Sequence, residues 1–400
     1  MKPATLCVQP GTANDANGAI VPPIYQTATF EQPSATEFGD YDYTRSGNPT
    51  RTLLEEQLAR LENGSYACAF ASGMAALAAL TQGLNPGEEI IAGDDLYGGT
   101  VRLLERVISN HQVVVRYVDT SNVDAVKQAT NSRTRLILIE TPSNPLFRIS
   151  DISQLSEVAH NVGAILAVDN SMLSPIFQRP LNLGADIVVH SATKFLCGHS
   201  DVTAGAVVTN DKTLHDAVAF QQNAQGAGLS PFESWLLLRG LKTLALRVER
   251  QNGSARRIAE FLQAQPSVLK VFYPGLDSHE GYAIHRRQAE GDGGVLSFTT
   301  GDPGFSARLV EATRLFRIAV SFGSVGSTIS LPCRMSHASI PPALRNRLGP
   351  PEDLVRVSVG IEDVNDLIDD LRTALQVSEA AGNIRRTLGS SDQVSWVASA

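Results

Sequence analysis

A single lysine, Lys194, stands in the segment "ADIVVHSATKFLCGHSD", which begins at Ala185. The apolar run before it predicts a buried strand that ends near His190, and the hydroxyl side chains of Ser191 and Thr193 follow directly. A partly desolvated lysine amine loses its proton and becomes a nucleophile. The segment therefore predicts a lysine nucleophile with hydroxyl donors beside it.

Polar residues also follow other predicted strands. Ser72, Gly73 and Met74 follow "YACAF" and open a helix, whose free backbone N–H groups and dipole favour a phosphate. Tyr97, after "EIIAG", offers a flat face to a ring, and Asp169, after "AILAV", offers a carboxylate to a protonated ring nitrogen. A phosphate, an aromatic ring, a ring N–H and an aldehyde for the lysine together describe pyridoxal 5'-phosphate (PLP).

These residues need an architecture that brings strand ends together. Strand and helix patterns alternate between residues 66 and 200, and the strands are apolar throughout, which is typical of a mostly parallel sheet covered on both faces. Ligands of such sheets bind beyond the carboxyl ends of the strands. We therefore expect an α/β fold with a large PLP-binding domain over residues 46–245.

The remaining segments are organised differently. Residues 1–45 contain several turn signals and predict an N-terminal arm, after which Asn48 and Pro49 can start a helix with an apolar stripe. Strand patterns become sparser in the second half of the chain, which indicates a smaller C-terminal α+β domain over residues 246–378. Residues 379–400 are polar and aperiodic, and we expect them to form an exposed tail.

Composition excludes several classes of protein. The formal charge is -8 and no block of Lys or Arg occurs, so we expect no nucleic-acid partner. The four cysteines lack metal-ligand spacing, which indicates neither a disulfide framework nor a metal site and fits a reducing cytosol. No signal or transit peptide is recognisable, and no apolar run approaches the roughly 20 residues of a membrane span. We therefore expect a cytoplasmic protein without a membrane partner.

A rival interpretation of the lysine segment must be weighed. Ser191 to Lys194 also satisfies S-x-x-K, the serine-acylase signature of β-lactamases. The accompanying S-D-N and K-T-G motifs are absent from the sequence, and Ser191 follows an apolar strand instead of opening a helix. The PLP interpretation is therefore preferred.

Six motifs in order carry a resemblance to a known family. They are "YDYTRSGNPTR", "ASGMAAL", "DDLYGGT", "ETPSNP", "AVDNS" and "SATKFLCGHSDVTAG". From Tyr25 to about Leu375 the chain resembles the Cys/Met-metabolism PLP enzymes of the cystathionine γ-synthase type. The resemblance implies a PLP-dependent transferase of fold type I, which is aminotransferase-like, and a homotetramer that is a dimer of dimers with shared active sites.

The resemblance also implies a cofactor-binding role for each matched residue. Lys194 would carry the Schiff base with PLP, Asp169 would hold the pyridine nitrogen and Tyr97 would stack on the ring. Tyr43 and Arg45 would reach the phosphate of the neighbouring subunit, although the residues alone favour a solvated surface arginine at Arg45. The phosphate would otherwise lie against the helix start and the lysine segment, which together contribute Ser72, Gly73, Met74, Ser191 and Thr193.

The matched residues of the second half would bind the substrate. Arg356 would grip the substrate α-carboxylate, while Ser321 and Asn144 would orient that carboxylate and the cofactor ring. Without the resemblance, Arg356 could be a salt-bridged arginine of an edge strand. Three residues would then be catalytic: Lys194, Tyr97 and Tyr43.

Local features bear on which reaction is catalysed. The segment "IAVSFGSVGSTISLPCRMSHASIPP" is most similar to plant-type cystathionine β-lyases. Val320 stands where several γ-acting members have glutamate, and Gly99 lies in the loop where methionine γ-lyases carry cysteine. Gly326 and Arg334 depart from the plant-type pattern, and we expect both near the substrate mouth, so another cysteine S-conjugate stays open as the substrate.

The sequence therefore predicts a PLP-dependent carbon–sulfur β-lyase that converts L-cystathionine to homocysteine, pyruvate and ammonia. The alternatives are a cystathionine γ-synthase, which replaces a group on an activated homoserine, and a cystathionine or methionine γ-lyase. A non-enzymatic binding module is disfavoured, because every matched catalytic position is filled.

Overall fold

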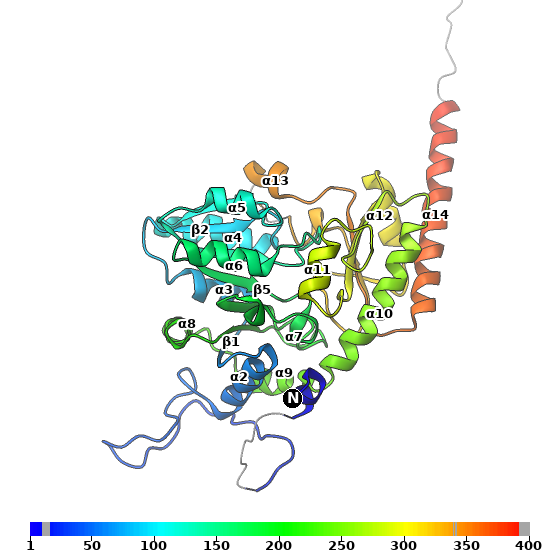
Figure 1. The fold of residues 1–400 in the computed structure, drawn as a ribbon. Helices are drawn as coiled ribbons and strands as arrows, with labels where there is room; N and C mark the ends of the chain where they lie inside the picture. The colour runs from blue at the N-terminus through cyan, green and yellow to red at the C-terminus, as the bar shows by residue number, and fades with distance from the viewer. Residues whose placement is uncertain (10–16, 339, 341, 392–400) are drawn as a thin grey trace, which may run out of the picture.

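The computed structural model describes residues 1–9, 17–338, 340 and 342–391, and its larger sheet lies at the centre of Figure 1. The strand order is β1-β7-β6-β5-β4-β2-β3. Neighbouring strands from β3 to β6 run parallel, whereas β7 is antiparallel to both β6 and β1. The expected mostly parallel sheet is therefore present, with an antiparallel edge. The strands are β1 Tyr66–Phe70, β2 Glu89–Gly93, β3 Val114–Val118, β4 Thr134–Glu140, β5 Ile165–Asp169, β6 Ile187–His190 and β7 Gly205–Thr209.

Alternate residues of the central strands pack on opposite faces of this sheet. In β4, Leu136 and Leu138 belong to one apolar cluster, and Ile137 and Ile139 belong to another. Since both faces are covered, such a strand has to be apolar along its whole length. The first cluster includes residues of α3 Gly73–Thr81, α4 Gly98–Arg106 and α8 Lys212–Gln225, and the second includes residues of α5 Val123–Ala129 and α6 Ile152–Asn161.

The N-terminal region starts with a short helix, α1 (Pro3–Val8), that the sequence did not predict. The predicted helix start near residue 48 is confirmed. The Asn48 side chain accepts a hydrogen bond of 3.0 Å from the Thr50 N–H, and Pro49 opens α2 (Pro49–Glu62). In Figure 1 the arm before α2 stands away from the body as a loop.

A five-stranded sheet forms the other half, in the order β10-β11-β12-β9-β8. Its strands are β8 Lys270–Phe272, β9 Val295–Thr299, β10 Arg317–Ile318, β11 Thr328–Ser330 and β12 Val355–Ser358. Two consecutive helices, α9 (Pro231–Leu241) and α10 (Leu244–Gln263), come before this sheet in the chain. The other helices are α7 Ser174–Phe177, α11 Tyr282–Gln288, α12 Pro303–Ala312, α13 Pro342–Leu348, α14 Val364–Ser391 and the 3₁₀ helices η1 Ile108–His111, η2 Pro180–Leu183 and η3 Pro332–Arg334.

The predicted tail differs from the structure. Helix α14 continues to Ser391, so the chain after residue 379 is helical and not irregular up to that point, while residues 392–400 lie outside the described part. In Figure 1 this helix extends well past the body. We propose residues 46–245 and 246–378 as the two domains, because the larger sheet ends at Thr209 and the smaller one begins at Lys270.

A buried arginine bonds the two halves together. Arg247 of α10 donates hydrogen bonds of 2.8 Å to the Phe195 carbonyl and 2.9 Å to the Gly240 carbonyl. A Cβ on Gly198 would lie 2.0 Å from its guanidinium, so only glycine fits there. Helix α10 thus holds the segment that follows Lys194. No helix in the described ranges combines the length and apolar character that crossing a membrane requires.

Candidate active site

A cavity of about 380 Å³ lies at the carboxyl ends of the central strands. Residues from the ends of β4 and β5, the segment after β6, the start of α3 and the second half of the chain line it together. The structure brings into it all the predicted site residues except Tyr43 and Arg45: Ser72, Gly73, Met74, Tyr97, Asn144, Asp169, Ser191, Thr193, Lys194, Ser321 and Arg356.

One end of the cavity is formed by the first turn of α3. The Ser72 hydroxyl caps this helix by accepting a 3.1 Å hydrogen bond from the Ala75 N–H. A Cβ on Gly73 would lie 2.9 Å from both Cα and Cβ of Ser191, so glycine allows the helix start to pack directly on the turn before the lysine. The Thr193 hydroxyl bonds to the backbone of Ala204 at 3.1 and 2.9 Å. The result is a compact end with free helix N–H groups and hydroxyls, which suits an anion.

The lysine amine projects into the cavity. Its Nζ donates a 2.5 Å hydrogen bond to the Ser321 hydroxyl, and it lies 4.9 Å from the centre of the Phe322 ring. Burial and the nearby Arg356 guanidinium lower the pKa of Lys194 to about 8, against the opposing charges of Asp169 and Glu140. The amine is therefore unprotonated in an appreciable fraction of molecules near neutral pH.

Two carboxylates lie side by side at the cavity wall. Asp169 of β5 is in register with Glu140 of β4, and it accepts a 2.9 Å hydrogen bond from the Ser171 N–H. Burial raises the pKa of Asp169, while the Ser171 hydrogen bonds and the charges of His190 and Lys194 lower it. Burial, followed by the charge of Asp169, raises the pKa of Glu140 well above its ordinary value. A cationic ring nitrogen at Asp169 would relieve this crowding of negative charge.

Tyr97 lines the cavity, and several neighbouring residues fix its position. Its backbone N–H donates a 3.2 Å hydrogen bond to Glu140, and its ring meets the buried His337 edge-on at 6.4 Å between centroids. A Cβ on Gly99 would lie only 2.3 Å from the ring atom Cε1. A side chain at position 99 would collide with the Tyr97 ring, so the observed ring position requires glycine there.

Arg356 is buried at the opposite wall. Its guanidinium donates hydrogen bonds of 2.8 Å to the Asn144 side chain and 3.1 Å to the Ser321 carbonyl, and it lies 5.4 Å from the centre of the Phe322 ring. Burial lowers the pKa of Arg356 to about 10, with the charge of Glu140 acting in the opposite direction. A charged fork with remaining donors beside the lysine is suited to an incoming carboxylate.

Tyr43 and Arg45 lie elsewhere. Both are exposed on the arm, and neither lines the cavity that contains Lys194 of the same chain. The Arg45 guanidinium instead bonds to Asn223 at the end of α8. Within a single chain the structure therefore leaves these two residues apart from the other predicted site residues.

The sequence interpretation did not assign a role to several residues that line the cavity. Glu140 ends a predicted strand, which was the available signal, whereas Phe322, Arg102, Met335 and Ser336 carry no local pattern. Gly326 and Arg334, expected near the substrate mouth, do not line the cavity itself. Within the described part of the chain, no group of three or more His, Cys, Asp or Glu side chains could hold a metal ion.

Comparison with known proteins decides the family. Residues 4–376 match the model of the Cys/Met metabolism PLP-dependent enzymes. The chain belongs to this family. It is 54% identical to the chloroplastic cystathionine beta-lyase of Arabidopsis thaliana, over 93% of this chain and 80% of that protein, and 45% identical to the cystathionine gamma-lyase of Bacillus subtilis, over 94% and 100%. The structure of cystathionine gamma synthase from Xanthomonas oryzae pv. oryzae in complex with cystathionine superposes with a TM-score of 0.92 at 40% identity, over 95% and 99%.

Membership of the Cys/Met metabolism PLP-dependent enzymes makes PLP the cofactor, and the cavity fits it. The first turn of α3 can hold a phosphate, the Asp169 carboxylate lies in the wall, and Lys194 is buried between them. A Cβ on Gly73 would be too close to Ser191 at the anion end of the cavity, and a Cβ on Gly99 would be too close to the Tyr97 ring. The predicted fold type I architecture is confirmed by these comparisons.

Proposed function

We propose that this PLP-dependent enzyme is a carbon–sulfur β-lyase that cleaves L-cystathionine to homocysteine, pyruvate and ammonia. The observation that carries the proposal is Val320. This apolar side chain lines the cavity next to Ser321, at the position where several γ-acting relatives have glutamate. The stronger resemblance to the plant β-lyase than to the bacterial γ-lyase supports the same choice.

We assign the residues around the cofactor as follows. Lys194 supplies the amine for the aldehyde of PLP, Asp169 faces the ring nitrogen and Tyr97 covers one face of the ring. The phosphate is held by the start of α3 and by the lysine segment, through Ser72, Gly73, Met74, Ser191 and Thr193. When bound, PLP withdraws electrons from the Cα of the attached amino acid, so that the Cα–H bond becomes acidic and a group on Cβ can leave.

The amine of Lys194 moves the protons. Once the substrate amino group has taken the place of the lysine on the cofactor aldehyde, the Lys194 amine would be free, and because its pKa is lowered to about 8, part of it would be unprotonated and able to accept the Cα proton. The Cβ–S bond then breaks with its electron pair on sulfur, and the protonated amine returns a proton to that sulfur. The hydrogen bond to Ser321 holds the amine at one place during both transfers. The thiol leaves as homocysteine, and the three-carbon fragment is hydrolysed to pyruvate and ammonia.

Substrate orientation is assigned to Arg356. Its guanidinium would bind the α-carboxylate while Asn144 and the Ser321 carbonyl hold the arginine itself in place. This arrangement sets the Cα–H bond toward Lys194 before the proton is transferred. Because position 320 is a valine, the cavity has no carboxylate there to pair with a distal amino group of the substrate.

Product analysis on L-cystathionine tests the proposal. Pyruvate together with homocysteine is expected, and 2-oxobutyrate together with cysteine would instead identify a γ-lyase. Activity only with an O-acyl- or O-phosphohomoserine plus cysteine would identify a γ-synthase and overturn the β-lyase assignment. Lys194→Ala serves as the control, because it should retain the fold and lose product formation.

We further propose a cytoplasmic homotetramer built from dimers with shared active sites. Large apolar side chains on the arm support an assembly, since Ile20 is 94% exposed and Phe38 is 71% exposed in the single chain. In the shared site, Tyr43 and Arg45 would reach the phosphate bound by the neighbouring subunit. Light scattering on the purified protein should give the mass of four chains, and a monomer would contradict the shared site.

A further inference from the structure

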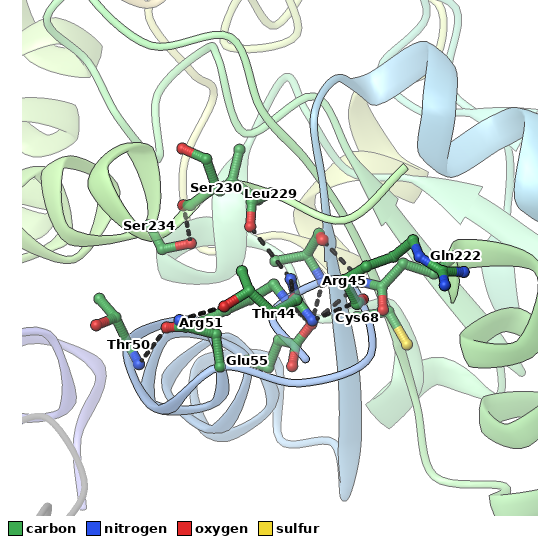
Figure 2. Close-up of polar contacts among 12 residues, drawn as sticks. Thr44, Arg45, Thr50, Arg51, Glu55, Cys68, Gln222, Leu229, Ser230 and Ser234 are labelled. Atoms are coloured by element: carbon green, nitrogen blue, oxygen red, sulfur yellow. Dashed lines mark hydrogen bonds and ion pairs between the residues drawn. The ribbon is translucent and has the colours of Figure 1, made fainter. Parts of the chain in front are cut away.

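Arg51, on the first turn of α2, is buried although it does not line the cavity that contains Lys194, and Figure 2 shows its polar contacts. Its guanidinium donates hydrogen bonds to three backbone carbonyls, at 2.9 Å to Thr44, 3.1 Å to Arg45 and 3.4 Å to Leu229. A guanidinium presents its donors in a rigid fork, so one side chain can hold two chain segments in one geometry. Arg51 therefore fixes the end of the arm against the body.

The Glu55 carboxylate forms an ion pair with Arg51. Glu55, one turn further along α2, lies 3.7 Å from the Arg51 Nε. The same Glu55 oxygen accepts hydrogen bonds of 2.8 Å from the Ala69 N–H and 3.2 Å from the Gln222 side chain. Ala69 belongs to β1, which leads directly into the first turn of α3. The arm is thus tied to the edge strand β1 of the larger sheet.

Tyr43 and Arg45, the two residues next to Thr44, are exposed on the arm. The Arg45 guanidinium bonds at 3.0 Å to the Asn223 carbonyl and at 3.2 Å to its side chain, in the last turn of α8, where the helix dipole favours a cation. The same guanidinium lies 5.5 Å from the centre of the Tyr43 ring. Tyr43 and Arg45 therefore form one preformed, exposed unit outside the cavity of their own chain.

We propose that Arg51 is a positioning residue that acts on the active site of a second copy of this chain. By holding the carbonyls of Thr44 and Arg45, it sets the direction in which Tyr43 and Arg45 leave the arm, so that both reach the partner's cofactor phosphate without further ordering. This inference rests on the shared active site of the proposed function. Arg51 itself touches neither substrate nor cofactor.

The first test compares Arg51→Gln with Arg45→Ala in the purified holoenzyme. Each should weaken PLP binding about tenfold or more, as measured by titration of the apoenzyme with PLP. The double variant should be no worse than Arg45→Ala alone, because both changes remove one function. Arg60→Gln is the matched control, since Arg60 lies on the same helix and bonds to the Gln9 carbonyl instead. Fully additive losses would show that Arg51 does not work through Arg45.

The second test mixes subunits. Arg51→Gln chains have an intact lysine and a misdirected arm, whereas Lys194→Ala chains have an intact arm and no lysine. After random reassembly of a two-fold dimer, half of the dimers are hybrid and each contains one complete site. At a PLP concentration too low to saturate the Arg51→Gln sites, about a quarter of wild-type activity should therefore appear. Equal mixtures of Arg45→Ala and Lys194→Ala chains serve as the reference.

The outcomes distinguish the proposed role of Arg51 from the proposed shared active site. Recovery in both mixtures supports the proposal. Recovery only with Arg45→Ala overturns the role of Arg51 in the partner's site and leaves the shared site standing. No recovery in the Arg45→Ala reference would refute the shared site itself. Should Arg51→Gln fold poorly, Arg51→Lys keeps the charge beside Glu55 but loses the fork, and it is expected to show the same complementation.

Discussion

The ring of Phe322 offers a sharp test of how the lysine is tuned. Phe322 is buried, and its ring lies between two cations, at 4.9 Å from the Lys194 amine and 5.4 Å from the Arg356 guanidinium. Both distances are within the roughly 6 Å over which an aromatic face attracts a cation. The ring therefore stabilises the protonated form of the lysine and opposes the effect of burial.

The size of the effect follows from this geometry. A desolvated cation–π contact contributes about 1 to 2 kcal/mol. Since 1.36 kcal/mol corresponds to about one pKa unit, Phe322→Leu should lower the pKa of Lys194 by roughly one unit from its value of about 8. The charged form loses a favourable contact and the neutral form does not, so the sign is downward.

The assay is the pH profile of kcat for pyruvate release. The neutral amine is the base, so activity rises with pH through the lysine pKa, and this acidic limb should move about one unit to lower pH in Phe322→Leu. Phe322→Tyr keeps the aromatic face and should leave the limb unmoved. An unshifted limb in the leucine variant, or an equal shift in both variants, would refute the reasoning.

Three further predictions concern binding and stability. Arg356→Lys keeps the charge but loses the fork, so KM for cystathionine should rise about tenfold to a hundredfold with a smaller change in kcat, measured by steady-state kinetics. In Gly99→Ala the new Cβ would lie 2.3 Å from the Tyr97 ring, so cofactor titration should show weaker PLP binding, whereas Gly253→Ala, which has open space, should not. Leu54→Ala removes a fully buried side chain and should lower the free energy of unfolding by about 2 to 5 kcal/mol in urea denaturation.

Each of these predictions has a clear contrary result. An unchanged KM in Arg356→Lys would mean that the guanidinium does not bind the substrate carboxylate. Equal cofactor affinity in Gly99→Ala would show that the ring can move without cost. A loss below about 0.5 kcal/mol in Leu54→Ala, the size typical of surface changes, would mean that the helix is not packed on the core as described.

Most strands that the sequence predicted have a buried apolar centre, although the buried β7 was missed. The inner residues of β2 and β4, Ile90 to Ala92 and Leu136 to Ile139, are apolar because they are buried on both faces of the sheet. β3 was missed, since it is an edge strand with Arg116 in its centre and only one buried residue. The tail was expected to be irregular because its polar residues show no apolar stripe, yet α14 continues there by propagation from the packed turns before it.

The site residues likewise divide into those that the sequence predicted and those that only the folded structure reveals. Lys194, Asp169 and the start of α3 follow predicted strands, so topology alone brings them to one edge. Phe322 and His337 follow no strand and gain their roles from side chains far away in the sequence. Arg51 has a pattern typical of a surface helix, and only the folded arm supplies the carbonyls that make it necessary.

The buried Arg247 has a mechanical consequence. Helix α10 belongs to the second half of the chain, yet it is bonded to the backbone immediately after the lysine, and the missing Cβ of Gly198 makes room for its guanidinium. Swinging the smaller half away would have to break these hydrogen bonds, each of which contributes about 1.5 to 3 kcal/mol when the donor is charged. Arg247 therefore opposes movement of the two halves, and we expect discrimination among amino acids to depend on the side chains that surround the amine.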